Sequence, residues 1–204
     1  KNPDSLKILS TTIDVTEFEF DGKEYFIRLL GLYQPANAAT VLAAIDVLRK
    51  HGFEISETAV KDGLSSAVWQ ARFEKIADEP VVLYDGGHNP QGVRAAVESV
   101  RAYFGDKKIN LLVGILADKA HGEMAEELAK IADRVICIAP PSPRALPAEA
   151  LAEEFCEAGA NARAANSIKA GVKIALSYKK PVLVIGSLYS YNDVSESVRN
   201  TLKG

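Results

Sequence analysis

From residue 81 onward, short apolar runs alternate with longer segments whose apolar residues recur at helical spacing. The first run, residues 81–84, is strand-like, and the segment after it carries an apolar helical face made of Val93, Val97, Val100 and Phe104. Further strands are predicted at residues 109–116, 134–139, 160–164 (a weak edge strand) and 181–186. Helices are predicted at residues 123–132, 147–159, 167–178 and 191–202. This alternation predicts an α/β fold, with a Rossmann-like, mostly parallel sheet covered on both faces.

The turn after the first strand, residues 85–90, places an acid beside a helix start. Gly86 and Gly87 free the backbone to turn, while Asn89-Pro90 has the signature of a helix N-cap followed by proline at the first helical position. Asp85 is then expected at the carboxyl end of a strand, where open α/β sheets bind ligands. An ordinary strand-to-helix turn explains the same residues. No G-x-G-x-x-G pattern occurs, which argues against a dinucleotide cofactor.

Residues 1–79 predict a smaller α+β domain. Residues 8–16 and 17–30 alternate apolar and polar side chains, and Asp21-Gly22, a hairpin signal, lies between the β-forming residues Phe20 and Tyr25. A helix is expected to start at Pro35 and to stop at His51-Gly52, with one inward face made of Ala38, Val41, Leu42, Ile45 and Leu48. A short helix capped by Ser56 follows. Residues 78–80 are predicted to be a linker, so the second domain is expected to span residues 80–204.

Composition excludes several classes of protein. The net charge of −3 and the absence of any Lys/Arg cluster argue against nucleic-acid binding. No apolar run approaches the ~18 residues that span a bilayer and no charged-then-apolar leader opens the chain, so no membrane contact and a cytoplasmic location are predicted. Cys137 and Cys156 lack metal-ligand spacing and are expected to be buried thiols. The start at Lys1, in mid-pattern, suggests a fragment.

The turn sequence Asp85-Gly86-Gly87-His88-Asn89-Pro90 resembles the Asp-x-Ala-His-Asn-Pro motif of folylpolyglutamate synthases and dihydrofolate synthases, members of the Mur ligase superfamily. Gly87 stands where that motif has alanine. Other stretches resemble the same family in the same order, and together they cover nearly the whole chain. The resemblance is to the C-terminal half of such an enzyme, which implies that residues 1–79 are a remnant of its central ATP-binding domain.

Two motifs in the first domain carry the implied nucleotide contacts. Residues 31–38 are similar to Gly-x-His-Gln-x-x-Asn-Ala, whose amides line the nucleotide site, and this implies the same role for Gln34 and Asn37. Tyr33 replaces the histidine. Residues 69–74 resemble Trp-Pro-Gly-Arg-x-Glu, whose arginine contacts nucleotide phosphates and corresponds to Arg72. A surface arginine beside a core tryptophan explains the second stretch equally well.

Three loops of the second domain resemble family segments and follow the carboxyl ends of predicted strands, so they are expected on the sheet edge that also carries Asp85 and His88. Residues 113–119 are similar to Val-Gly-x-x-x-Asp-Lys, residues 142–145 to Ser-x-Arg-Ala, and residues 186–189 to Gly-Ser-Leu-Tyr. Taken one at a time, the first loop is typical of a solvated turn, the second of a proline-stiffened loop and the third of a helix cap. Matched together, they imply a catalytic Ser187 and candidate substrate loops that carry Asp118, Lys119, Ser142 and Arg144.

The family joins L-glutamate to the γ-carboxyl of a folate, or to dihydropteroate, and ATP drives the reaction through an acyl phosphate. The resemblance implies that Asp85 accepts hydrogen bonds from the ribose hydroxyls and that Arg72 holds phosphate oxygens. It also implies that His88 and Ser187 lie near the glutamate or the reacting centre. The expected cofactors are ATP and Mg²⁺. The family's phosphate-binding loop and metal ligands lie in its N-terminal part, so this chain is expected to supply no metal ligands and to need that part as its partner.

Two other interpretations stay open at this point. Peptidoglycan ligases of the same superfamily add amino acids to UDP-muramoyl acceptors, although residues 88–90 and 186–189 favour the folate branch. A non-catalytic α/β interaction module is the second alternative. In such a module, the acid, the arginine and the amides would lie on unrelated surfaces.

Overall fold

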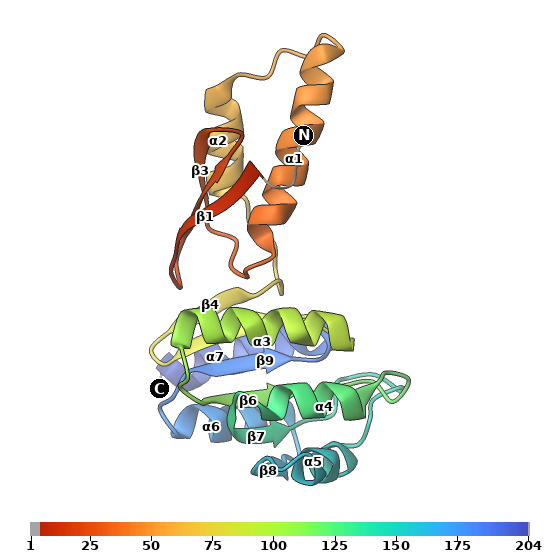
Figure 1. Ribbon diagram of the computed structural model, residues 1–204. Coiled ribbons are helices and arrows are strands. Elements are labelled where there is room, and N and C mark those ends of the chain that lie inside the picture. The colour runs from red at the N-terminus through yellow and green to blue at the C-terminus, as the bar shows by residue number, and fades with distance from the viewer. Residues whose placement is uncertain (1–4, 204) are drawn as a thin grey trace. The chain divides into compact units, whose positions relative to one another are not determined.

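The structure is a computed structural model that describes residues 5–203. The chain divides into two compact units, Lys1–Gln70 and Ala71–Gly204, and each unit is described by itself (Figure 1). The division lies nine residues before the predicted boundary between residues 79 and 80. The difference arises because residues Glu74–Asp78 form a strand, β4, that pairs with the second unit.

The first unit contains a three-stranded antiparallel sheet of order β1-β2-β3, formed by β1 (Leu6–Thr11), β2 (Thr16–Phe20) and β3 (Lys23–Ile27). The predicted hairpin at Asp21-Gly22 is confirmed, and both residues adopt positive φ, 50° and 74°, as a tight hairpin turn requires. The run predicted at residues 8–16 is wrong as one strand. Thr12 interrupts it, because its backbone N–H donates to the carbonyl of Val15 and closes a turn.

Two helices, α1 (Gln34–Lys50) and α2 (Glu57–Ser66), complete the first unit. The predicted cap of α2 is confirmed, since the hydroxyl of Ser56 accepts from the N–H of Ala59. The small core joins the inner face of the sheet to both helices and includes Phe18, Phe20, Tyr25, Leu42 and Leu64. Val41 and Leu48 were predicted to face inward in α1, but they are 49% and 41% exposed within the structure.

The second unit is built on a six-stranded sheet of order β4-β5-β9-β6-β7-β8. Five of its strands run parallel, which confirms the predicted Rossmann-like α/β architecture. The strands are β4 (Glu74–Asp78), β5 (Val81–Asp85), β6 (Ile109–Val113), β7 (Ala132–Cys137), β8 (Ala162–Ala164) and β9 (Val182–Ile185). The weak strand predicted near residue 162 is confirmed as the edge strand β8.

The edge strand β4 corrects the predicted linker. Its sequence, Glu-Lys-Ile-Ala-Asp, has few of the β-branched or aromatic residues that indicate a strand. It forms nevertheless, because it pairs antiparallel with β5, with Glu74 opposite Tyr84 and Asp78 opposite Val81. Glu79 and Pro80 therefore form the turn between two paired strands, and residues 71–79 belong to the second unit.

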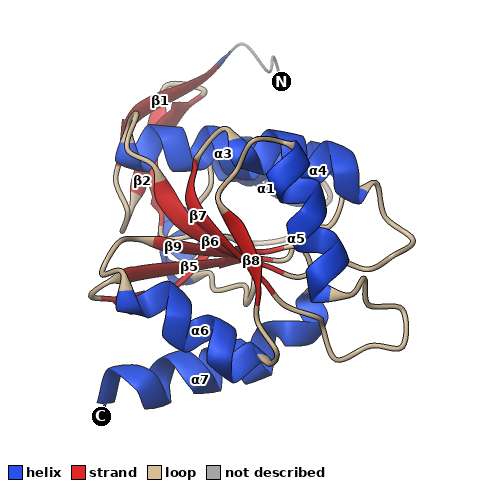
Figure 2. Cartoon of the chain, turned by 90° about the horizontal axis from the view of Figure 1, so that it is seen from below, coloured by secondary structure: helices blue, strands red, loops and turns tan. Residues whose placement is uncertain are grey.

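Helices cover both faces of the large sheet (Figure 2). Helices α3 (Pro90–Phe104) and α4 (His121–Ala129) lie on one face, while α6 (Ile168–Ser177) and α7 (Tyr191–Lys203) lie on the other. Helix α5 (Ala148–Glu157) packs beside α4 and against β7 and β8. The predicted N-cap of α3 is confirmed, since Asn89 Oδ1 accepts from the N–H of Gly92 at 2.8 Å.

The two cysteines differ in their surroundings. Cys137 is buried at the end of β7, where desolvation raises the pKa of its thiol to about 12. The prediction that Cys156 is also buried is wrong, because its side of α5 faces solvent. Within residues 5–203, no helix is long and apolar enough to cross a membrane.

Candidate functional site

The carboxyl ends of the parallel strands lie at one level of the sheet. Asp85 at the end of β5 is opposite Ile185 of β9, which is opposite Val113 of β6, and Val113 is opposite Cys137 of β7. The loops that follow these strands therefore leave the sheet along the same edge. Asp85 ends β5 and Ser187 follows the end of the neighbouring strand β9 by two residues, so both lie, as predicted, on one rim of the sheet, formed by these strand ends and the loops after them.

The topological switch point of the large sheet lies between its neighbouring strands β5 and β9. After β5 the chain enters α3 on one face of the sheet, whereas after β9 it enters α7 on the other face (Figure 2). Neighbouring strands whose connections depart in opposite directions mark the point where open α/β sheets bind ligands. The two predicted catalytic residues, His88 and Ser187, lie in the two loops that border this point.

Two glycines in these loops, Gly86 and Gly186, have neighbouring atoms close to the position of a Cβ atom. A methyl group on Gly86 would overlap the side chain of Leu188, which lies in the short 3-10 helix Leu188–Ser190. Gly186 adopts a φ of 114°, and a methyl group there would lie 2.6 Å from the carbonyl oxygen of Gly114. The contact at Gly186 is with backbone and comes with a positive φ, so this position requires glycine, whereas the contact at Gly86 is with the end of a leucine side chain.

Asp85 is buried, with 4% of its surface exposed. One carboxylate oxygen accepts from the backbone N–H of Phe73 at 2.9 Å, and the other accepts from the N–H of Gly87 at 2.6 Å. Hydrogen bonds of this kind, to a charged acceptor, are among the stronger ones in proteins. Asp85 therefore links the loop of residues 71–73 to the turn of residues 86–88, a structural role that the sequence analysis did not predict.

Arg72 lies in that linked loop, and its side chain is exposed. Its neighbours Ala71 and Phe73 adopt left-handed backbone conformations, with φ of 56° and 49°. Such conformations cost energy in residues other than glycine and persist only where surrounding contacts enforce them. Three hydrogen bonds do so: Phe73 N–H to Asp85, Ala71 N–H to Glu74 Oε2 at 2.7 Å, and Gly86 N–H to the Ala71 carbonyl at 2.8 Å.

His88 is half-buried at the end of the same turn. Its Nδ1 lies 3.0 Å from the carbonyl oxygen of Gly86. A carbonyl oxygen can only accept, so Nδ1 carries the hydrogen and donates. In the neutral ring, Nε2 is then the unprotonated nitrogen, and it can accept a proton or a hydrogen bond from a ligand.

Ser187 is 5% exposed and caps the 3-10 helix, because its hydroxyl accepts from the N–H of Tyr189 at 3.2 Å. Its backbone carbonyl accepts from the hydroxyl of Tyr84 at 2.7 Å. The serine is thus held at both its side chain and its backbone. Leu188 and Tyr189 are exposed beside it.

The predicted substrate loops form a second cluster on the same edge. Arg144 donates to Asp118 at 3.2 Å, Lys119 lies 3.6 Å from the same carboxylate, and the hydroxyl of Ser142 accepts from the N–H of Arg144. The backbones of the two loops are also joined, since the N–H of Ala117 donates to the carbonyl of Arg144. The structure therefore brings these four predicted residues together.

The remaining predicted pair, Gln34 and Asn37, belongs to the first unit. Asn37 Nδ2 donates to Gln34 Oε1 at 3.0 Å, so the two amides meet at the start of α1 as expected. Gln34 is buried and Asn37 is exposed. Trp69 contradicts the alternative account of residues 69–74, because its side chain is 66% exposed and is not a core residue.

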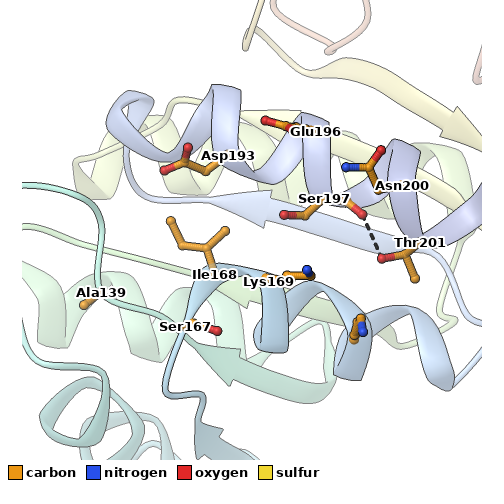
Figure 3. Close-up of a pocket in the computed structure, with 10 residues that line it drawn as sticks. Ala139, Ser167, Ile168, Lys169, Asp193, Glu196, Ser197, Asn200 and Thr201 are labelled. Atoms are coloured by element: carbon orange, nitrogen blue, oxygen red, sulfur yellow. Dashed lines mark hydrogen bonds between the residues drawn. The ribbon is translucent and has the colours of Figure 1, made fainter.

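A groove of about 710 Å³ lies between α6 and α7 (Figure 3). Helix α6 supplies Lys169 and Lys173 to it, and α7 supplies Asp193, Glu196 and Asn200. None of the predicted site residues lines this groove. Among residues 5–203, no three His, Cys, Asp or Glu side chains gather into a group that could hold a metal ion.

Comparisons with known proteins agree with this architecture. Residues 71–188 match the family described as "Mur ligase, glutamate ligase domain". The folylpolyglutamate synthase of Lacticaseibacillus casei is 32% identical over 186 residues, covering 87% of this chain and 40% of that protein. The crystal structure of folylpolyglutamate synthase from Thermotoga maritima superposes with a TM-score of 0.80 and 26% identity, covering 95% of this chain and 46% of that one. The structure of Escherichia coli FolC in complex with DHPP and ADP superposes with a TM-score of 0.77 and 28% identity, and it covers 99% of this chain and 47% of that one.

The chain spans less than half the length of each of these relatives. The resemblance to folylpolyglutamate and dihydrofolate synthases that the motifs indicated is confirmed. The family match covers more than half of the 204 residues, and it begins at Ala71, where the second compact unit begins. The chain therefore belongs to the Mur ligase family, and residues 71–188 form its glutamate ligase domain.

Proposed function

We propose that the chain is the C-terminal part of an ATP-dependent ligase that adds L-glutamate to the γ-carboxyl group of folates, with dihydropteroate as a second acceptor. The observation that carries this proposal is the convergence of Arg72, Asp85, His88 and Ser187 on three contacting loops, residues 71–73, 85–88 and 186–189, at the sheet's switch point. The similarity to folylpolyglutamate synthases supports it. In a non-catalytic module, nothing would require these polar groups to share one rim.

The reaction needs an activated acid, because a carboxylate repels an attacking amine and its oxide is a poor leaving group. Phosphoryl transfer from ATP to the γ-carboxylate forms an acyl phosphate and releases ADP. The amine of glutamate then attacks the carbonyl carbon, a proton leaves the nitrogen, and the tetrahedral intermediate expels phosphate to leave the amide. Most of the catalysis is expected to come from placement and charge stabilisation.

Three residues of the rim suit separate parts of this reaction. Arg72 presents a permanently charged, planar set of donors on a loop fixed from both sides, which suits contact with phosphate oxygens. His88 offers Nε2 as an acceptor and is proposed to bind the glutamate amine or to take its proton. Ser187 is proposed to lie next to the glutamate. Asp118, Lys119, Ser142 and Arg144 are proposed as substrate contacts.

Asp85 is proposed to contribute in two ways. Its ribose contact stays a prediction, and only 4% of the residue is accessible. Its hydrogen bonds to Phe73 and Gly87 hold the loop that carries Arg72, and this contribution needs no access to the carboxylate. Gln34 and Asn37 are proposed to belong to a nucleotide-binding domain of which residues 1–70 are one part.

The proposed cofactors are ATP and Mg²⁺, and the proposed partner is an N-terminal part that carries the phosphate-binding loop. Residues 5–203 contain no group of three His, Cys, Asp or Glu side chains that could hold a metal ion, and the ligands of Mg²⁺ are proposed to lie in that N-terminal part. The exposed apolar residues of α1, Val41, Val47 and Leu48, support a covering partner for the first unit.

The test is an assay of the complete protein with ATP, L-glutamate and either tetrahydrofolate, dihydropteroate or a UDP-muramoyl peptide. We expect glutamate addition to the folate acceptor. Replacement of Arg72 by alanine should reduce kcat/KM by about 100-fold or more, as expected for the loss of a transition-state charge contact. Lys173→Ala is the matched control, because it removes an exposed cation far along α6. Activity with the muramoyl acceptor alone, or an unaffected Arg72→Ala variant, would refute the proposal.

A further inference from the structure

Two tyrosines beneath the rim contact each other edge to face. Tyr84 in β5 and Tyr191 at the start of α7 have ring centroids 5.1 Å apart and an interplanar angle of 82°. Tyr84 is fully buried, and Tyr191 packs partly buried against the same core. This edge-to-face arrangement is favoured by the charge distribution of aromatic rings.

The hydroxyl groups of the two tyrosines reach different loops. Tyr84 donates to the backbone carbonyl of Ser187 at 2.7 Å, across 103 residues of sequence. Tyr191 donates to Glu74 Oε1 at 3.1 Å, and the second oxygen of the same carboxylate accepts from the N–H of Ala71. One tyrosine therefore holds the loop of residues 186–189, and the other holds the loop of residues 71–73 through Glu74.

The side chains of Tyr84, Tyr191 and Glu74 form one contiguous unit. Glu74 of β4 is directly opposite Tyr84 of β5 in the antiparallel ladder, so the carboxylate that receives Tyr191 lies beside the ring that Tyr191 contacts. The hydroxyl of Tyr84 is buried, and without a partner it would destabilise the fold, so Tyr84 is compatible with this core only while the loop of Ser187 stays in place. Phenylalanine at position 84 would pack equally well but would make no hydrogen bond to the carbonyl of Ser187.

We propose that Tyr84 and Tyr191 are positioning residues that fix the loop of Ser187 and the loop of Arg72 relative to each other. The ligands assigned to those loops rest on the proposed function. The link between the two loops rests on the hydrogen bonds of Tyr84 and Tyr191 alone. A reaction that passes an acyl phosphate to an amine requires the phosphate contact and the amine contact to keep a constant separation. The tyrosine pair supplies that constraint from below the rim.

The link can be tested in the chain itself by amide hydrogen exchange. The variants are Tyr84→Phe, Tyr191→Phe and the double variant, each of which removes a hydroxyl and keeps the ring. Tyr178→Phe is the matched control, because its ring contacts Arg134 at 4.5 Å on another part of the unit. The two reporters are the N–H of Ala71, which is bonded to Glu74, and the N–H of Tyr189, which is bonded to Ser187.

We expect each single variant to speed exchange at the loop it holds by about tenfold, the effect of one lost hydrogen bond. The link further predicts an increase of about threefold at the other loop. Changes confined to the loop that lost its own hydroxyl contact, or equal changes in Tyr178→Phe, would overturn the proposal. This measurement needs no ligand, so its result is independent of the proposed ligase activity.

A second readout separates positioning from stability. In the complete protein, Tyr84→Phe and Tyr191→Phe should lower kcat by about tenfold or more, because small misplacements of reacting groups are costly. KM for glutamate should change less than about threefold, since the loops themselves are intact. A variant whose loss of activity follows only its melting temperature would show a merely structural role and would overturn the proposal. Absence of any ligase activity would refute the proposed function but leave the exchange result standing.

Discussion

The carboxylate of Asp85 accepts the backbone N–H of Phe73 at 2.9 Å, twelve residues earlier in the chain. This bond, with the one from Gly87, joins the loop that carries the predicted phosphate contact Arg72 to the turn of residues 86–88. An acid that the motif marks as a ligand contact is thus also a structural element of the rim. Its removal should therefore affect stability as well as ligand binding.

Asp85→Asn is expected to destabilise the second unit by about 2–3 kcal/mol, because the amide replaces one acceptor by a donor that faces a backbone N–H. Urea unfolding measures this change. Asp118→Asn is the control: its contact with Arg144 is exposed, and we expect a loss below about 1 kcal/mol. Equal effects of the two substitutions would contradict the structural role of Asp85.

Gly186→Ala should be strongly destabilising, by about 3 kcal/mol or more, because the new methyl group would meet the backbone of Gly114 at 2.6 Å and the φ of 114° disfavours any side chain. Gly159→Ala separates the two causes. Gly159 also has a positive φ, 82°, but nothing lies near its Cβ position, so we expect about 1 kcal/mol. Similar losses at both glycines would show that the close contact at Gly186 is absent.

The two thiols should react at very different rates. We expect one equivalent of a thiol reagent to react fast at pH 8, with the exposed Cys156, and a second to react only on unfolding, with Cys137.

The stability of the second unit should fall at high pH because of Cys137. Burial raises the pKa of its thiol from 9.0 to about 12, so the protonated thiol favours folding fully below pH 9, and this contribution falls as the pH rises from 9 toward 12. The resulting decrease in the free energy of unfolding should reach about 1 kcal/mol near pH 10. Cys137→Ala should flatten the fall of unfolding free energy over this range, and an unchanged slope would contradict the assignment.

Lys179→Gly should stabilise the second unit by about 0.5–1 kcal/mol. Lys179 follows the C-cap of α6 with a φ of 52°, the left-handed position where helices commonly end with glycine. Thermal unfolding measures the gain. Lys173→Gly, at an exposed position inside the same helix, should instead cost about 1 kcal/mol. A loss in both variants would rule out the left-handed conformation at residue 179.

The isolated chain should bind ATP weakly or not at all, because we propose that the phosphate-binding loop lies in another part of the enzyme. Isothermal titration calorimetry is the direct measurement. The same titration of the complete protein is the positive control. Micromolar or tighter binding by the 204 residues alone would contradict this expectation.

Much of the large sheet could be predicted from the sequence. The runs that form β5, β6 and β9 are almost wholly apolar, which is typical of strands buried on both faces, and the Asn89-Pro90 cap marks the start of α3. Placement of Asp85, His88 and Ser187 on one rim followed from the parallel topology alone. Strand β4 escaped prediction because it depends on pairing with β5 more than on its own residues.

The contacts that organise the rim could not be predicted, because they join residues far apart in the chain. Nothing in an apolar run shows that the hydroxyl of Tyr84 reaches Ser187, or that Glu74 connects Ala71 to Tyr191. The exposure of Val41 and Leu48 was missed for a related reason. Helical spacing reveals an apolar face but not whether the described residues cover it.

The outermost strand β8 has only three residues, and the side chain of Arg163 at its centre is exposed. Unpaired peptide groups of an outermost strand can hydrogen-bond to a strand of another molecule. A strand of three residues with a cation at its centre offers few such groups and disfavours this pairing. Concentrated solutions of this protein should therefore resist intermolecular strand pairing along that border.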